Sequence, residues 1–235
     1  MYVDGRDISL SPHLMMRGMW EPWITMAIAK HIKPGQRCID IGANIGYYTL
    51  LLAGLVGPAG HVLAIEPGKR SIDLAWRTLN INGMHNRVNF IQAGASDEEY
   101  MAEHVVPEQL QGGAILRRAV DGAETKHPIV KCGPIDRWPA ANVYDWDFIK
   151  IDVEGMERQV FDGLRGTLAR LNHVTVAMEI TPYHWPDGCE GFLDSMKLQG
   201  YSVGMVSEAG EIVPLDDYTA LPKEQGQWKM LWIQK

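Results

Sequence analysis

Short apolar runs of strand length alternate along the chain with longer amphipathic stretches. This alternation predicts a parallel sheet with helices on both faces, because parallel neighbours need crossover connections. The last apolar run follows no helix-length segment, so we expect it to pair antiparallel with the strand before it. The pattern predicts strands over 36–41, 61–66, 88–95, 147–153, 173–180, 201–208 and 229–234, and helices over 46–56, 69–82, 156–171 and 190–199.

The predicted fold is α/β, with a doubly wound, Rossmann-like sheet that is mostly parallel and has an antiparallel terminal strand. We expect a single domain over 34–235, preceded by an N-terminal helical extension over 1–33. The rhythm breaks at about 96–128, a long, polar stretch that contains glycine. A hairpin-like insert is predicted there, with short strands around 100–106 and 114–119.

Composition narrows the class of protein. The 235 residues are 46% hydrophobic and 22% charged, which suits a globular chain with one full-sized core. Three cysteines without CxxC spacing argue against a disulfide framework or structural zinc and favour a reducing, cytoplasmic setting. The N-terminus lacks the basic start of a signal peptide, and no apolar run reaches membrane-spanning length. The net charge of −7 disfavours nucleic acid as a partner.

A glycine-containing turn, DIGANIG at 40–46, joins the first predicted strand to its helix, where open parallel sheets bind ligands. Its glycines let the backbone approach a ligand, and the N–H groups of the helix start face that ligand. Asp40 is a poor neighbour for a pyrophosphate but suits a cation. S-adenosylmethionine carries a sulfonium and an ammonium group and no phosphate, so we predict it as the cofactor. The residues assigned to its site here are Asp40, Gly42, Ala43, Asn44 and Tyr47.

Two further segments lie at strand ends. Glu66 ends the second predicted strand, twenty residues after Gly46, where a carboxylate usually accepts hydrogen bonds from both ribose hydroxyls. Ser96 and Asp97 follow the third strand, where the edge of an adenine ring would lie, and Asp97 can accept from the exocyclic amine. A helix or turn cap explains Asp97 equally well.

A charged cluster, KIDVEGME, occupies 150–157. Period-2 geometry places Lys150, Asp152 and Glu154 on one side of an otherwise apolar strand, with Asp152 near the carboxyl edge, where we expect it to face and bind the cofactor. Charges in a central strand are costly unless they are paired or functional. A structural ion-pair network of Lys150 with Glu154 and Glu157 is the alternative. Glu179, at the end of the next strand, converges on the same edge of the sheet.

The candidate catalytic residues are Asp152, Glu179, His184 and Lys150. Asp152 and Glu179 could orient a substrate hydroxyl, act as a base or share a divalent cation, although no metal site is assigned. Histidine as a residue type suits proton transfer near neutral pH, which makes His184 a candidate base, but a loop histidine packed on Trp185 is an equally good interpretation.

Six motifs resemble those of the FkbM-type methyltransferases, a class I family that uses S-adenosylmethionine and acts mainly on hydroxyl groups. The resemblance implies an active site at Asp152 and Glu154. The place of Glu21 in the first motif suggests that this residue reaches the cofactor's amino end. The cofactor contacts that the resemblance implies are Asp40, Gly42, Asn44, Glu66 and Asp97. The motifs are WEPW (20–23), IDIGANIGYYTLLLA (39–53), VLAIEP (62–67), LNING (79–83), FIKIDVEGMERQVFDG (148–163) and AMEI (177–180).

We therefore predict O-methylation of a hydroxyl group on a small molecule, a sugar or glycolipid, or a natural product. The alternatives are a nitrogen or carboxylate acceptor, or a cofactor-binding protein without this activity. The N-terminal aromatic residues, including Trp20 and Trp23, predict a helix docked on the core or else a wall for the cofactor or acceptor. Trp228 in the tail is a further candidate wall.

Overall fold

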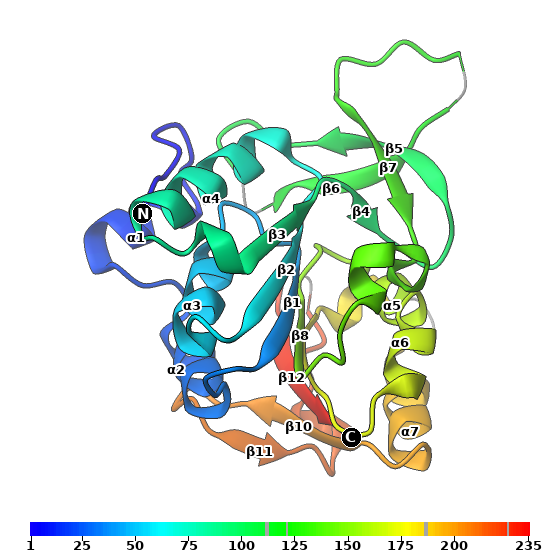
Figure 1. The fold of residues 1–235 in the computed structure, drawn as a ribbon. Coiled ribbons are helices and arrows are strands. Elements are labelled where there is room, and N and C mark those ends of the chain that lie inside the picture. The colour runs from blue at the N-terminus through cyan, green and yellow to red at the C-terminus, as the bar shows by residue number, and fades with distance from the viewer. Residues whose placement is uncertain (111–112, 121, 186–187, 225) are drawn as a thin grey trace.

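An eight-stranded sheet organises the structure, a computed structural model that describes residues 1–110, 113–120, 122–185, 188–224 and 226–235 (Figure 1). Strands β3, β2, β1, β8 and β9 are parallel neighbours in that order, as the alternation predicts. The sheet strands are β1 (Arg37–Ile41), β2 (His61–Ile65), β3 (Val88–Ile91), β8 (Phe148–Ile151), β9 (Thr175–Ile180), β10 (Ser202–Val206), β11 (Ile212–Pro214) and β12 (Lys229–Gln234).

The terminal strand β12 runs antiparallel between β9 and β10. Its pairing with β10 confirms the expected antiparallel contact with the preceding long strand. The short strand β11 was not expected, and it pairs with the other side of β10. The predicted α/β fold class, a mostly parallel sheet with an antiparallel terminal strand, is confirmed.

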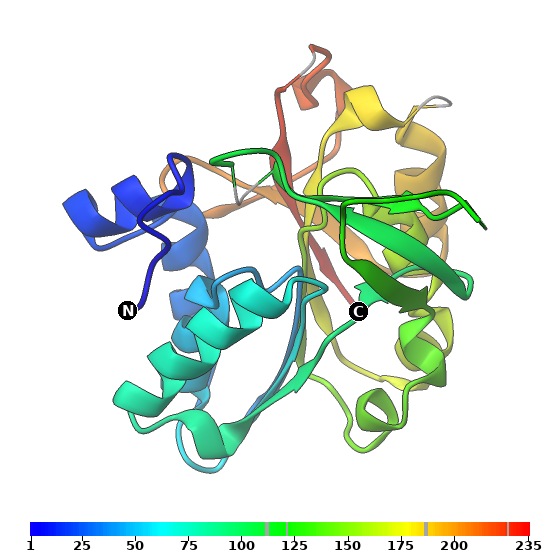
Figure 2. The ribbon, with the colours of Figure 1, turned by 90° about the horizontal axis from the view of Figure 1, so that it is seen from above.

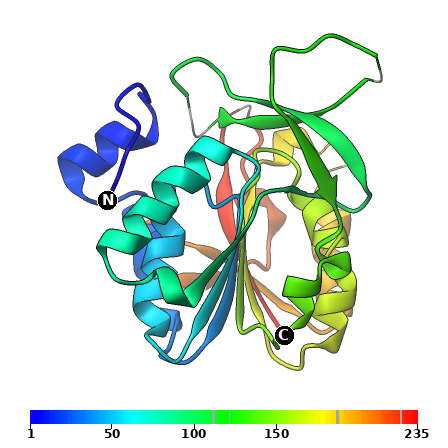
Figure 3. The same ribbon diagram turned by 45° about the horizontal axis from the view of Figure 1, so that its top comes forward.

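Helices cover both faces of the sheet (Figure 3). α2, α3 and α4 lie on one face, and α5, α6 and α7 lie on the other. Each face has its own cluster of buried apolar side chains. The helices are α1 (Leu10–Arg17), α2 (Pro22–His31), α3 (Tyr47–Val56), α4 (Lys69–Ile81), α5 (Glu157–Asp162), α6 (Arg165–Arg170) and α7 (Glu190–Leu198), and the 3-10 turns are His85–Arg87, Ile135–Arg137, Pro139–Asn142, Pro182–His184 and Tyr218–Ala220.

One predicted helix is divided. The periodicity predicts a single helix over 156–171, but the structure has α5 and α6 with a break at 163–164. The carboxylate of Asp136 accepts hydrogen bonds from the Gly166 and Thr167 backbone N–H groups at 2.6 and 2.7 Å. This long-range contact gives α6 its own N-terminal cap, so the prediction of one continuous helix was wrong.

The region after β3 builds a second sheet in the order β4-β7-β5-β6. Two of its strands, β5 and β6, pair antiparallel at the positions predicted for a hairpin. The predicted strand over 88–95 is divided, because its last residues, β4, pair with β7 instead. In Figure 1 this small sheet lies above the top of the main sheet, and in Figure 2, seen from above, it lies on the side toward the viewer. Its strands are β4 (Gly94–Ala95), β5 (Tyr100–Val105), β6 (Ile115–Arg118) and β7 (Ile129–Gly133).

The N-terminal extension packs against the main sheet through α2. Ile24, Ala27 and Ile28 of α2 are fully buried in the cluster that also contains Trp232 of β12. Within the residues that the structure describes, no helix combines the length and apolarity needed to cross a membrane.

Glycine 42 lets the turn after β1 touch the turn after β8. Its φ is +78°, and a Cβ atom built there would lie 1.8 Å from the Asp152 carbonyl oxygen. Gly35 also has a positive φ, of +87°, but a Cβ there would meet no described atom within 4 Å. Substitution of Gly35 therefore tests the backbone conformation alone, whereas substitution of Gly42 tests the same conformation together with the close contact.

Gly35→Ala and Gly42→Ala form a matched pair for urea unfolding. The left-handed conformation alone is expected to cost Gly35→Ala about 1–2 kcal/mol. Gly42→Ala must also displace the β8 turn, so its free energy of unfolding should fall by about a further 1–3 kcal/mol. Equal losses in the two variants would contradict the close contact.

Candidate active site

A cavity of about 570 Å³ opens at the carboxyl ends of the parallel strands. Residues from β1, β2, β8 and β9 and their following turns form its base. The N-terminal extension, the small sheet and Trp228 in the tail form its walls. Its volume is in the range typical of small-molecule and cofactor sites.

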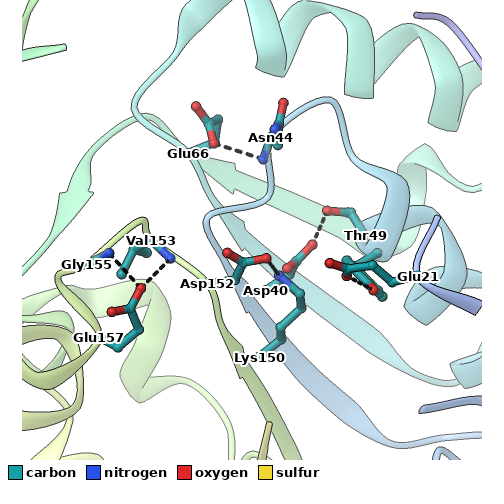
Figure 4. A network of polar contacts seen from close by, with 11 residues as sticks. Glu21, Asp40, Asn44, Thr49, Glu66, Lys150, Asp152, Val153, Gly155 and Glu157 are labelled. Atoms are coloured by element: carbon teal, nitrogen blue, oxygen red, sulfur yellow. Dashed lines mark hydrogen bonds and ion pairs between the residues drawn. The ribbon is translucent and has the colours of Figure 1, made fainter. Parts of the chain in front are cut away.

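The turn after β1 is tied to the end of β2 by backbone hydrogen bonds. The Gly42 and Ala43 N–H groups both donate to the Ile65 carbonyl at 3.0 Å. Asn44, with φ at +48°, donates its N–H to Glu66 Oε2 at 2.8 Å (Figure 4). These bonds hold the two turns together at the cavity.

Glu66 is 6% exposed and lines the cavity. Its other carboxylate oxygen, Oε1, accepts from the Gly68 N–H at 2.8 Å. Burial raises the pKa of Glu66 to about 7, even though both backbone hydrogen bonds act in the opposite direction. This carboxyl is therefore close to half-ionised at neutral pH.

A buried cation lies at the base of the cavity. Lys150 is 1% exposed, and its Nζ lies 2.8 Å from Asp152 Oδ2 and 4.6 Å from the centre of the Tyr48 ring. Burial alone would lower the pKa of Lys150, but the charges of Asp152 and Asp40 hold it above its ordinary value. Lys150 is thus a fixed ammonium group that holds the Asp152 carboxylate in place.

Glu21 comes from the N-terminal extension and approaches the same cluster. Its backbone has a φ of +40° directly before Pro22, the first residue of α2. The Tyr48 hydroxyl donates to Glu21 Oε2 at 2.6 Å. Burial, followed by the nearby charge of Asp152, raises the pKa of Glu21 to about 7.

Two more carboxyl groups line the cavity beside Asp152. Burial and the charges of Asp152 and Glu154 raise the pKa of Glu179 to about 10. Desolvation and Asp152 raise the pKa of Glu154 to about 7, although its side chain still reaches solvent. In the part of the chain that the structure describes, no group of three or more His, Cys, Asp or Glu side chains is arranged to share a metal ion.

Glu157 shapes the loop that carries Glu154. Its Oε1 accepts from the Gly155 N–H at 2.9 Å and from the Val153 N–H at 3.3 Å (Figure 4). Glu154 itself has a φ of +55°. The alternative network of Lys150 with Glu154 and Glu157 is not what the structure has, because Lys150 pairs with Asp152 and Glu157 bonds to backbone.

Most of the candidate residues meet at this cavity. The proposed roles of all of them stay predictions, because position alone does not assign a role. The candidates that line the cavity are Glu21, Gly42, Ala43, Asn44, Tyr47, Glu66, Lys150, Asp152, Glu154 and Glu179.

Four candidates lie outside the cavity lining. Asp40 is fully buried behind it and accepts from Thr49 Oγ1 at 2.6 Å. Ser96 and Asp97 follow β4, which belongs to the small sheet because it pairs with β7. Ser96 is buried next to Gly163, and Asp97 is exposed. His184 is exposed and lies against Gly155.

Sequence reasoning missed Tyr48 and the loop-shaping role of Glu157. Tyr48 is buried, lines the cavity and contacts both Glu21 and Lys150. The tyrosine pair at 47–48, at the start of the helix after the cofactor turn, indicated that one tyrosine ring could reach the site. Helical geometry alone does not say which of the two rings faces the cluster. Tyr47 instead exchanges a 2.9 Å hydrogen bond with Thr25.

The sequence of the chain matches the family model of the methyltransferase FkbM domain over residues 40–205, more than half of its length. The chain belongs to the FkbM methyltransferase family. This confirms the family resemblance, and it makes S-adenosylmethionine the cofactor of this methyltransferase domain.

Known proteins share parts of this domain. A crystal structure of methyltransferase FkbM from Methylobacillus flagellatus KT superposes with a TM-score of 0.53 at 17% identity, covering 84% of this chain and 43% of that one. The ubiquinone/menaquinone biosynthesis C-methyltransferase UbiE of Vibrio campbellii is 29% identical over 85 residues, 36% of this chain and 33% of UbiE. Protein-L-isoaspartate O-methyltransferase 1 of Arabidopsis thaliana is 32% identical over 71 residues, 28% of each chain. The chain thus spans about a third of the length of the two curated relatives, UbiE and the isoaspartate methyltransferase.

The cavity fits this cofactor chemically. Among the described residues that line it, five carboxyl side chains outnumber the cations Arg17 and Lys150, and Lys150 is already paired with Asp152. A ligand with a sulfonium and an ammonium group matches that excess of acid. Glu66 retains unused acceptor positions for ribose hydroxyls, and the residues that would hold the amino end are Glu21 and the turn at 42–44.

Binding of S-adenosylmethionine should tighten as pH rises from 6 to 8. Below about pH 7 the Glu21 and Glu66 carboxyls are mostly protonated and neutral, so they attract a cation less. Binding must then release protons, and each linked proton changes affinity by up to about tenfold per pH unit below the pKa. Titration calorimetry at pH 6, 7 and 8 measures this slope.

Adenosine, which lacks both the sulfonium and the ammonium group, is the control ligand. Its affinity should depend less on pH than that of S-adenosylmethionine, and Glu21→Gln should reduce the slope for the charged cofactor. Affinity that falls with rising pH, or equal slopes for both ligands, would contradict this electrostatic account.

Proposed function

We propose that the protein transfers a methyl group from S-adenosylmethionine to a hydroxyl group of a small-molecule or saccharide acceptor. The observation that supports this proposal best is the Lys150–Asp152 ion pair at 2.8 Å, which presents a carboxylate to the cavity beside Glu179. A hydroxyl acceptor must lose one proton during transfer, and a positioned carboxylate can take it.

The cofactor, when bound, supplies an electrophilic methyl group. Asp152 then has the role of proton acceptor, and Lys150 fixes its orientation. Glu179, with its pKa raised to about 10, is protonated at neutral pH and can donate a hydrogen bond to the acceptor. Positioning of this kind can lower a barrier by several kcal/mol, more than a single base usually contributes.

The other candidate bases are less suitable. Lys150 remains protonated because its pKa is held above its ordinary value. His184 lies outside the cavity lining and is exposed. The remaining candidate, Asp152, has the position and the partner that this role needs.

An aromatic wall supports a ring-containing acceptor. Trp20, Trp23 and Trp228 line one side of the cavity, and the Trp23 and Trp228 rings stack with centroids 6.4 Å apart and an angle of 26°. Flat indole faces accommodate apolar or glycosidic rings. The excess of carboxyl groups disfavours an anionic acceptor, so the alternative of a carboxylate acceptor fits this cavity less well.

We also propose a reducing, cytoplasmic setting. Cys38, Cys132 and Cys189 are all free and buried, as is common for cysteines that are not exposed to oxidation.

Incubation with radiolabelled S-adenosylmethionine and fractionated extract, followed by identification of the labelled product, tests the proposed acceptor class. Label on a hydroxyl of a small molecule or saccharide is expected. Label found only on nucleic acid or on protein lysines would overturn the hydroxyl proposal.

Asp152→Asn tests the proposed proton acceptor. It should lower turnover by about 10²–10⁴, while the affinity for S-adenosylhomocysteine should change by much less. His184→Ala is the comparison variant for turnover. An equal loss in His184→Ala, or unchanged turnover in Asp152→Asn, would remove Asp152 from this role.

A further inference from the structure

His104 is a buried polar group that the proposed reaction does not use. It lies on β5 of the small sheet, is 6% exposed and lines the cavity. Its ring atom Nε2 is buried and has no hydrogen-bond partner among the described residues. An imidazole nitrogen in this position points to a ligand that supplies the missing partner.

The position of this nitrogen sets it apart from other unpartnered atoms. A buried polar atom without a partner costs about 1–3 kcal/mol, so each one needs an explanation. Of the described residues with such an atom, His104 lines the cavity and the others do not. The others are Ser11, Asp40, Arg87, Glu157, Thr167 and Trp232.

His104 lies next to the carboxylate expected to hold the ribose. A Cβ atom built on Gly68 would lie 2.8 Å from Glu66 Oε1 and 2.9 Å from His104 Cε1. The same point lies 3.3 Å from the hydroxyl of Ser71, which also lines the cavity. Because residue 68 is glycine, no side chain separates the imidazole from the carboxylate.

The chemistry of the ring complements that of the carboxylate. Burial and the charge of His127 lower the pKa of His104, which keeps the imidazole neutral. A neutral imidazole has one donor and one acceptor, whereas an ionised carboxylate only accepts. Adenosine presents hydroxyls, purine nitrogens and an exocyclic amine, so it needs both kinds of partner.

We propose that His104 Nε2 is a binding group for the adenosine portion of S-adenosylmethionine, supplied by the small sheet. The small sheet therefore contributes directly to the cofactor site. Asp97, which follows the small sheet's first strand β4, is exposed and lies outside the cavity lining, so it does not occupy this position.

Titration calorimetry with S-adenosylhomocysteine and with adenosine tests the proposal. His104→Leu, which fills the space without polar atoms, should weaken both ligands by a similar factor of about ten, the loss expected of one hydrogen bond. His104→Gln, which retains a donor and an acceptor, should lose less. His173→Gln, exposed just before β9 and outside the cavity lining, should bind both ligands as the unmodified protein does.

Unchanged or tighter binding by His104→Leu would overturn the proposal, and so would weakening of S-adenosylhomocysteine without weakening of adenosine. If His104→Leu does not fold, the His104 Cε1–H resonance of the unmodified protein gives the answer. That resonance, assigned by its absence in His104→Gln, should shift on saturation with S-adenosylhomocysteine, and no shift would overturn the assignment. Neither measurement involves an acceptor, so a failed hydroxyl proposal would leave this result intact.

Discussion

The cavity depends on one buried cation. Lys150 is almost inaccessible to solvent at the centre of the sheet, and an unpaired ammonium group there would be very costly. Asp152, Asp40 and Glu21 compensate that charge. The compensation is mutual, because several carboxyl groups at one edge of a sheet would repel one another without it. Removing Lys150 would therefore change the protonation of the whole cluster as well as one ion pair.

The same cluster is held by turns with unusual backbone conformations. Glu21, Asn44 and Glu154 have positive φ angles and all line the cavity. Such residues cost about 1–3 kcal/mol each and persist only where the surroundings fix them. Here Pro22, the Asn44–Glu66 hydrogen bond and the Glu157 side chain fix the three turns. Backbone strain thus concentrates where the carboxyl groups must converge.

Sequence reasoning could predict the sheet and the residues at the ends of its central strands, because strand periodicity determines which side chains share an edge. Glu66, Asp152 and Glu179 meet at the cavity for that reason. The same reasoning placed Asp97 near the adenine, but the chain leaves the main sheet after β3, and periodicity does not indicate such a departure. The place of Tyr48 in the cavity depends on how α3 is rotated, and that of His104 depends on the second sheet. Both are properties of tertiary packing, which local sequence patterns do not indicate.

The sheet and the segments around it contribute different residues to the cavity: strand ends carry the charged groups, and the surrounding segments carry the aromatic wall. Side chains at strand ends are fixed by the core, so they suit charges that must hold one geometry relative to a cofactor. The aromatic wall comes from the N-terminal extension and the tail, which are joined by the stacked pair Trp23 and Trp228. In the part of the chain that the structure describes, none of the hydrogen bonds and ion pairs of the Lys150 cluster passes through those rings, and only Glu21 of that cluster lies next to them, between Trp20 and Trp23. Under the proposed function, acceptor preference can therefore change at Trp228 without rebuilding the charged centre.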